Sequence, residues 1–290
     1  MGLRRLTTTR KEEKVDNQSS YQIQNISGNL ETELNRLKAQ VELFWEKELK
    51  RYKEFGLKDG MSVIELGCGP GFVIEKLMDA FPRVNITGME LDPFLVQYAR
   101  DYLQAKNFNR CKIIGGSIMD TGLPGNSFDF AITRLVLEHL SDPVNAVREV
   151  HRILKPGGRA VFIDNDFEMH MMTSPHVPEL RELYEAYCRA RYAEGGNPKI
   201  GRELPTILKK GGFSNIEFEI IGAHSGILGD EKFFKSEGVG IPYKLVEAGY
   251  LPSKVLGSIN VKWKKMIYDD SHAIIRQLYL SAGEKSAQMN

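Results

Sequence analysis

Apolar residues recur along this chain in two alternating patterns, short continuous runs and longer stretches with helical spacing. The short runs are typical of buried strands, and they occupy residues 63–66, 84–90, 111–114, 128–133 and 159–164. The helical stretches between them cover residues 71–81, 93–106 and 143–154. Strands that alternate with helices predict an α/β fold with a doubly wound, mostly parallel sheet and right-handed crossovers. In such a sheet, ligands bind beyond the carboxyl ends of the strands.

Helical patterns also precede and follow this core. Apolar residues at helical spacing cover residues 30–55, where we expect two helices separated by a break. Further helices are predicted at 178–194 and, as a pair around Gly249 and Pro252, within 230–270. Two later strands, at 215–222 and 274–282, bring the sheet to seven, with the last strand antiparallel. We therefore expect one domain over 29–290, with helical lid insertions near 167–200 and 225–270.

The first 28 residues are polar and predict a flexible N-terminal arm. Three arginines precede the first acid, so a transit peptide stays open as the less favoured alternative.

A glycine-rich turn joins the first strand to its helix. The turn reads E-L-G-C-G-P-G from Glu65 to Gly71, and the second strand ends at Glu90. Glycines allow a sharp bend and let a ligand approach the backbone closely. In an NAD site the third glycine comes one residue later, and Phe72 stands at a position that such sites keep small. The spacing therefore argues against an NAD-dependent oxidoreductase.

Four further motifs follow the glycine turn in a fixed order. They read G-S-I at 116–118, L-P…N-S-F-D at 123–129, L-E-H-L at 137–140 and L-K-P-G-G at 154–158. With the turn, they make residues 30–165 resemble the class I S-adenosylmethionine (SAM) methyltransferases, and residues 201–222 are similar to that family's last helix and sixth strand. The resemblance implies a Rossmann-like sheet, SAM as the cofactor and methyl transfer as the reaction.

The resemblance also implies which residues bind the cofactor. The methionine end would meet the turn, Glu90 would accept both ribose hydroxyls, Leu91 and Ile118 would enclose adenine, and Ser117 would meet the adenine edge. The family usually has Asp at the Ser117 position. The backbone of Arg134 would lie near the sulfonium. The complete predicted set is Glu65, Gly67, Cys68, Gly69, Gly71, Glu90, Leu91, Ser117, Ile118 and Arg134.

Candidate catalytic groups follow the fourth and fifth strands. A hydroxyl or ammonium acceptor needs a base for its proton, and His139 lies where the transferred methyl should point. Asp166 and His170 are further candidates near the end of the fifth strand, and Glu138 is a less favoured helper. Methionines around His170 offer an adaptable apolar surface, which suggests a hydrophobic or aromatic acceptor. Turn capping by the acids and a structural role for His139 remain the competing interpretations.

Composition narrows the function classes. The net charge is +1, without a basic stripe, so we expect no nucleic-acid partner and no attraction to anionic membranes. No apolar run approaches the roughly 18 residues needed to cross a bilayer. The three cysteines lack metal-ligand spacing and suggest free thiols in the cytoplasm, so no metal is expected. The polar arm and the long first helical segment are compatible with a homo-oligomer.

The sequence thus predicts a SAM-dependent methyltransferase acting on a small hydrophobic or aromatic molecule at O, N or C. Methylation of protein or RNA, and SAM binding without catalysis, remain open alternatives.

Overall fold

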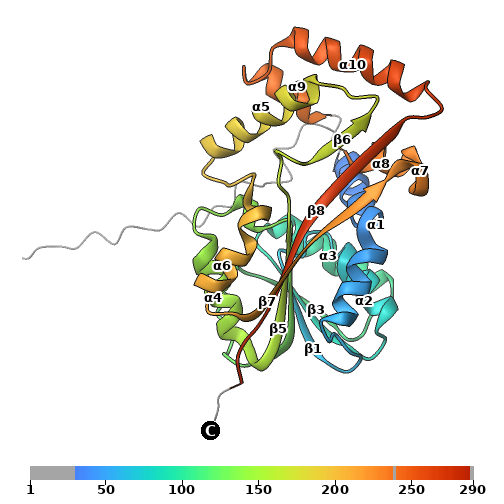
Figure 1. Ribbon diagram of the computed structural model, residues 1–290. Coiled ribbons are helices and arrows are strands. Elements are labelled where there is room, and N and C mark those ends of the chain that lie inside the picture. Colours follow the sequence, from blue (N-terminus) through green and yellow to red (C-terminus); the bar gives the residue numbers. More distant parts are fainter. Residues whose placement is uncertain (1–29, 238–239, 288–290) are drawn as a thin grey trace, which may run out of the picture.

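The computed structural model describes residues 30–237 and 240–287, and the predicted arm, residues 1–28, lies outside these ranges. Its centre is a single sheet of eight strands, in the order β3-β2-β1-β4-β5-β8-β6, with β7 also paired to β8 (Figure 1). The strands are β1 (Ser62–Leu66), β2 (Asn85–Glu90), β3 (Cys111–Gly115), β4 (Phe128–Arg134), β5 (Leu154–Asp164), β6 (Met171–Ser174), β7 (Ser214–His224) and β8 (Ala273–Glu284). The predicted Rossmann-like α/β class is confirmed.

The register of the sheet brings distant segments to one edge. Strands β1 to β5 are parallel, and β8 is antiparallel to β5, β6 and β7. Both β5 and β6 pair along one edge of β8, because β7 occupies its other edge over shared residues such as Arg276. The carboxyl ends of β1, β2 and β4 lie together, so the turns that follow these strands meet there.

Helices cover both faces of the sheet, which explains the continuous apolar runs in the strands. Figure 1 shows α1 (Leu30–Glu54) and α2 (Phe72–Ala80) on one side and α4 (Pro143–Ile153) and α6 (Leu204–Lys210) on the other. Helix α3 (Pro93–Ala105) packs with α2. Along β1, Val63 packs with α1, α2 and α3, whereas Ile64 and Leu66 pack with α4 and α6.

Two helices begin at Asp-Pro pairs that the sequence shows plainly. The side chains of Asp92 and Asp142 accept hydrogen bonds from backbone N–H groups in the first turns of α3 and α4, and a proline follows each.

Helix α1 is a single helix of 25 residues, so the predicted break within 30–55 was wrong. No glycine or proline interrupts this segment, and its apolar face stays in register against the sheet. The buried residues Trp45 and Tyr52 pack against each other at 6.4 Å between ring centroids.

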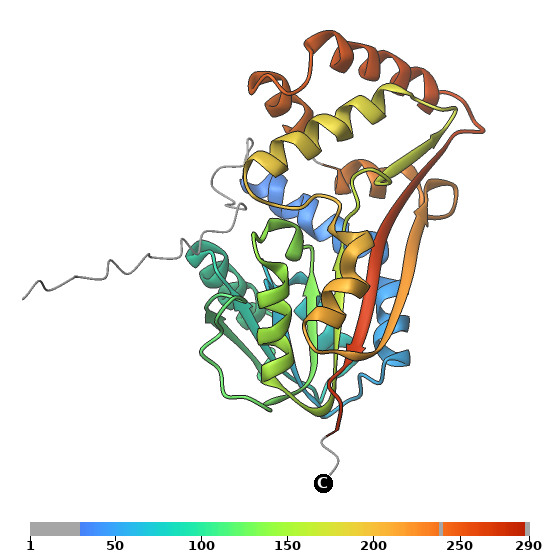
Figure 2. The same cartoon turned by 60° about the vertical axis from the view of Figure 1, so that its left-hand side comes forward.

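A helical lid covers the carboxyl end of the sheet. Figure 2 shows α5 (Glu179–Ala193) and α10 (Ser253–Ile267) running above the strands, and α9 (Gly240–Glu247) packs against both of them. Helix α8 (Asp230–Ser236) packs on α1, next to the short α7 (Ser225–Leu228). The lid insertion at 225–270 thus holds α7 and α8 besides the predicted pair, and β6 is an eighth strand that the sequence did not predict.

Within residues 30–237 and 240–287, no helix combines the length and apolarity needed to cross a bilayer.

Candidate functional site

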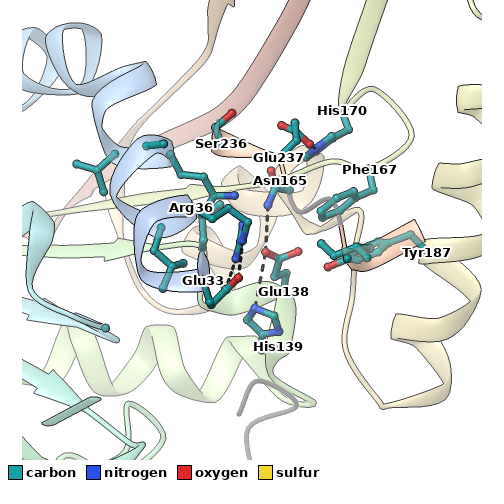
Figure 3. Close-up of a pocket in the computed structure, with 18 of the residues that line it drawn as sticks. Glu33, Arg36, Glu138, His139, Asn165, Phe167, His170, Tyr187, Ser236 and Glu237 are labelled. Carbon is teal, nitrogen blue, oxygen red and sulfur yellow. Dashed lines mark hydrogen bonds and ion pairs between the residues drawn. The ribbon is translucent and has the colours of Figure 1, made fainter. Parts of the chain in front are cut away.

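A cavity of about 2200 Å³ lies between the carboxyl ends of the parallel strands and the lid. Ligand pockets typically hold about 300–1,000 Å³, so this cavity has room for a cofactor and a second molecule. The turns after β1, β2 and β3 line one end, which we call the cofactor half. Side chains after β4 and β5, together with α1, α5 and α8, line the other end, which we call the acceptor half (Figure 3).

Gly67 and Gly71 are both required in the glycine turn for steric reasons, but only Gly67 lines the cavity. At Gly67 the backbone has φ of 72°, and an added Cβ would lie 2.4 Å from Cγ2 of Val136. At Gly71 φ is 85° and an added Cβ would lie 2.9 Å from Leu103, but this residue does not line the cavity. Gly67, Cys68 and Gly69 line the cofactor half. Gly71 therefore supports the turn by packing, which differs from the predicted contact with cofactor.

Two carboxylates flank this turn. Glu65 is 2% exposed, and its Oε2 has no hydrogen-bond partner within the described residues. Burial raises the pKa of Glu65 well above its ordinary value. An orphaned, buried acceptor of this kind is suited to a ligand that brings a hydrogen-bond donor, such as the amino group of SAM.

Glu90 is organised by the backbone around it. Its Oε2 accepts a hydrogen bond from the Gly69 N–H (2.9 Å), and its Oε1 accepts from Leu91 (2.8 Å) and Asp92 (3.0 Å). Burial raises the pKa of Glu90. A carboxylate has about four acceptor positions, so one remains on Oε2 for a ribose hydroxyl. These three backbone N–H groups thus fix the orientation of the Glu90 carboxylate.

The predicted adenine region forms the outer rim of the cofactor half. Leu91, Ser117 and Ile118 all line the cavity, and Leu91 is 39% exposed. The Ser117 hydroxyl accepts a hydrogen bond from the Met119 N–H (3.2 Å), which leaves its own proton to donate. These residues, Glu65 and Glu90 together fit an adenosyl cofactor.

Arg134 joins the site to helix α1. Its Nε donates to both carboxylate oxygens of Glu48 at 3.0 and 3.1 Å, and its Nη2 donates to the Gln40 carbonyl at 2.9 Å. Glu48 is fully buried, and Arg134 is 9% exposed. The side chain therefore has a structural partner, and the backbone of Arg134 stays the candidate for the cofactor contact.

The centre of the acceptor half is Glu138, in the short 3₁₀ turn Leu137–His139 after β4. Its Oε1 accepts a hydrogen bond from Asn165 Nδ2 at 3.0 Å, while its buried Oε2 has no partner within the described residues. Figure 3 shows Glu138 between Asn165 and His139, with Arg36 on one side and Phe167 and Tyr187 on the other. The Asn197 N–H donates to the Glu138 carbonyl, which fixes the backbone here.

Both predicted histidines line the acceptor half. The pKa of His139 is lowered to about 3 by burial and by Arg191 and Arg36. Burial and Arg276 lower the pKa of His170 to about 4, although Glu237 lies 3.4 Å from its Nε2. Both rings are therefore neutral at pH 7.

Asp166 lies away from the cavity. Its carboxylate is buried and accepts hydrogen bonds from Arg202, with 2.8 Å between Arg202 Nη2 and Oδ1. This ion pair satisfies the acid, and Asp166 does not line the cavity. We therefore do not retain it as a catalytic candidate.

The three methionines near His170 do not share one environment. Met171 lines the cavity, whereas Met169 and Met172 are 46% and 43% exposed. Met171 and Met172 are successive residues of the strand, so their side chains point to opposite faces. Met169 precedes the strand.

An aromatic shelf, formed by Phe167, His170, Tyr184 and Tyr187, lies beside Glu138. Phe167 stacks on His170 with 4.3 Å between ring centroids, and the Phe167 and Tyr187 centroids are 4.1 Å apart. All four residues line the cavity.

Several polar residues of the acceptor half were missing from the predicted site. Arg36 pairs with Glu33 at 2.5 Å, and Arg276 donates from Nε to Glu237 at 2.8 Å. These residues come from α1, β8 and the end of α8, and no motif in the sequence connects them. Within the described ranges, no cluster of His, Cys, Asp or Glu is arranged to hold a metal ion.

Comparison with known proteins agrees with this geometry. Residues 64–162 match the family model described as a methyltransferase domain. The chain is 28% identical over 204 residues to an uncharacterized 37.1 kDa protein in a transposon of Streptomyces fradiae, covering 68% of this chain and 55% of that protein. It is 25% identical over 146 residues to the demethylmenaquinone methyltransferase of Listeria welshimeri, covering 50% and 58%.

A solved structure gives the same picture of the fold. Phosphoethanolamine N-methyltransferase 2 of Haemonchus contortus, in complex with phosphomonomethylethanolamine and S-adenosylhomocysteine, superposes with a TM-score of 0.56 at 20% identity. The match covers 86% of this chain and 56% of that chain. The chain spans little more than half the length of the curated relatives named above. The motifs, the sheet order and the family match agree in showing a class I SAM-dependent methyltransferase domain, which the family model places at residues 64–162.

Proposed function

We propose that this protein transfers a methyl group from SAM to a small molecule with an apolar or aromatic body. The observation that carries the proposal is the continuity of the cavity from Glu65 and Glu90 to the acceptor half. When bound, SAM supplies a methyl group on a sulfonium, which is a good leaving group. The chain itself then has to hold the acceptor in line with that methyl, at roughly 3–3.5 Å.

The lining of the acceptor half supports a small molecule. Lid side chains from α5, α9 and α10, among them Leu183, Leu245, Ile259 and Trp263, enclose it together with the aromatic shelf. Such a concave, largely apolar site is typical of small ligands. The name of the Listeria relative points to a quinone-type acceptor, and the Haemonchus protein was crystallised with a phosphorylated amine.

In this proposal the cofactor contacts are those of Glu65, Gly67, Cys68, Gly69, Glu90, Leu91, Ser117 and Ile118, with the backbone of Arg134. His139 and His170 line the acceptor half as neutral groups that orient the acceptor.

Two measurements test the proposal. Calorimetry should show that S-adenosylhomocysteine binds and NAD does not. Incubation with methyl-labelled SAM and separate small-molecule, RNA and protein pools should then label the small-molecule pool. Label found only in RNA or protein would contradict the acceptor class. Tight cofactor binding without turnover in any pool would indicate a SAM-binding protein that is not an enzyme.

A further inference from the structure

We infer that the acceptor carries a neutral hydroxyl on an aromatic ring, and that Glu138 Oε2 accepts the proton of this hydroxyl during methyl transfer. The inference rests on the proposed function and names the chemical class of its acceptor. Three properties of the acceptor half lead to it: an orphaned acceptor atom, arginines that already have anionic partners, and an aromatic shelf beside them.

The orphaned atom is a proton acceptor with a fixed direction. Glu138 is 4% exposed, and Asn165 Nδ2 holds Oε1 at 3.0 Å while Oε2 has no partner within the described residues. The Asn165 amide is oriented in turn, because Arg276 Nη1 lies 3.4 Å from its Oδ1. A buried carboxylate oxygen without a partner is unfavourable, because it has lost its hydration and gained no hydrogen bond. A ligand that donates a hydrogen bond at this point removes that cost.

The arginines around the acceptor half do not offer a receptor for an anion. Arg36 pairs with Glu33, Arg276 pairs with Glu237, and Arg191 donates to Tyr187 and Glu194 at 2.9 and 2.8 Å. A phosphate or carboxylate on the acceptor would have to displace one of these carboxylates. The acceptor half is therefore poorly suited to the phosphorylated amine seen in the Haemonchus structure.

The same arginines disfavour a cationic acceptor. Burial, and after it the charges of these arginines, lowers the pKa of His139 to about 3 and that of His170 to about 4. A field that opposes protonation of two imidazoles also opposes an ammonium group placed between them. A neutral donor remains, and a hydroxyl satisfies Glu138 without adding charge.

The aromatic shelf favours an acceptor whose hydroxyl is attached to an aromatic ring. Phe167 and Tyr187, with 4.1 Å between centroids, lie next to Glu138 in Figure 3. Aromatic rings that pack on one another gain a favourable interaction beyond the area that they bury. A phenol also has a pKa near 10, which is within reach of a carboxylate base when the oxygen attacks.

Glu138 is better placed than either histidine to take this proton. Burial raises its pKa, which makes it a stronger base than an exposed carboxylate. Asp164, behind Glu138, accepts hydrogen bonds from the backbone N–H groups of Leu137 and Asn165, and burial raises its pKa well above the ordinary value. The charged and titratable groups that face Glu138 are Arg36 from α1, Asp164 from β5, Tyr187 and Arg191 from α5, Arg276 from β8, and His139.

The step balances without another reactant. A bond forms between the hydroxyl oxygen and the methyl carbon while the bond from that carbon to sulfur breaks and its electron pair goes to sulfur. The hydroxyl proton moves to Glu138 Oε2 and later leaves to water.

A binding experiment tests the inference without turnover. Calorimetry with S-adenosylhomocysteine present compares four naphthalene probes: 2-naphthol, its methyl ether, the 2-aminomethyl compound and 2-naphthoate. The wild-type protein should bind 2-naphthol at least tenfold more tightly than the other three. In Glu138→Gln, Asn165 holds the amide oxygen at the Oε1 position, so the amide nitrogen replaces Oε2 and presents a donor. The preference for naphthol over its ether should then fall at least tenfold, and Glu182→Gln, on the exposed face of α5, should leave it unchanged.

A kinetic experiment separates proton removal from positioning. Glu138→Gln should slow methyl transfer to 2-naphthol by at least 100-fold, the usual scale for a lost general base. Transfer to 4-nitrophenol at pH 8, where that phenol is largely ionised, should slow much less, since no proton has to be removed. A structural role alone would slow both equally. Glu138→Asp keeps the carboxylate and should keep the preference for naphthol over its ether, which maintains the test if the Gln variant does not fold.

The outcomes also separate this inference from the proposed function. Equal binding of the four probes, a preference for the amine or the carboxylate, or equal slowing with both phenols would overturn the inference. Methylation of the amine probe alone would contradict the inference of a hydroxyl acceptor but would agree with the proposed function. Failure of S-adenosylhomocysteine to bind the wild-type protein would remove both.

Discussion

The cofactor half and the acceptor half of the cavity are built by different means. In the cofactor half, backbone N–H groups from two adjacent turns hold one carboxylate, Glu90, and the residues involved lie close together in the chain. In the acceptor half, side chains from five elements hold one another through ion pairs and stacked rings. Backbone contacts, as in the cofactor half, suit a cofactor that many proteins share. Side-chain contacts, as in the acceptor half, allow single substitutions to change which molecule binds.

A buried ion pair with Glu48 holds Arg134, at the end of β4, to helix α1. Replacing Arg134 with Met leaves Glu48 buried without its partner, and we expect the free energy of unfolding to fall by about 3–5 kcal/mol. Urea unfolding measures this change. Arg181→Met is the matched control, because its pair with Glu185 is exposed and should contribute less than about 1 kcal/mol. A loss as small as that of the control would show that this ion pair does not hold α1 to the end of β4.

The free energy of unfolding should depend on pH through His170 of the acceptor half. The pKa of folded His170 is about 4, below the roughly 6.5 of an unfolded histidine, so the unfolded chain binds the proton first. The stability that His170 contributes is therefore complete above pH 6.5 and is lost as the pH falls towards 4. Relative to His170→Asn, the wild-type protein should lose about 2 kcal/mol between pH 7 and pH 5.

Urea unfolding at both pH values measures this difference. Substitution of the exposed His176 by Asn supplies the control. A pH-independent difference between wild type and His170→Asn would contradict the neutral state assigned to the ring.

Glu90→Ala should act on the cofactor half alone. It removes the ribose acceptor and leaves three backbone N–H groups without their carboxylate, so affinity for S-adenosylhomocysteine should fall at least tenfold, about 1.4 kcal/mol. Calorimetry gives this value, and Glu138→Gln should leave it unchanged. A similar loss in both variants would mean that the halves are not independent.

The smallest effect is expected at Met172. This side chain lies on the exposed face of β6, so Met172→Gln should leave binding of 2-naphthol within twofold of wild type. The substitution of Met171, which lines the cavity, should weaken binding more. Equal effects on calorimetric affinity would indicate that the lid moves enough to bring both methionines to the ligand.

Most residues that the sequence assigns to the cofactor line one end of the cavity, because they follow neighbouring strands. The turn from Glu65 to Gly71 and the acid at Glu90 each follow a strand whose apolar run is short and plain. A parallel sheet then brings their ends together without further information.

The acceptor half depends on contacts between residues far apart in the chain. Glu237 and Arg276 are brought together with Asn165 only by the pairing of β8 and the packing of α8, which no local pattern encodes. Strand β6 was not predicted for a related reason. Residues 171–174 are too few to show an alternating pattern, and they form a strand because they pair with β8. Asp166 follows the end of β5, which made it a reasonable candidate. The sequence does not show that its carboxylate is already paired with Arg202.

Strand β8 has a consequence for biosynthesis. It fills the place beside β5, yet it leaves the ribosome about 110 residues after β5 ends. At typical translation rates of roughly 5–20 residues per second, β5 waits about 5–20 s with an open hydrogen-bonding edge. An unpaired edge of this kind invites pairing with other nascent polypeptides. Codon choice and chaperone supply over this interval should therefore govern how much soluble protein a cell can produce.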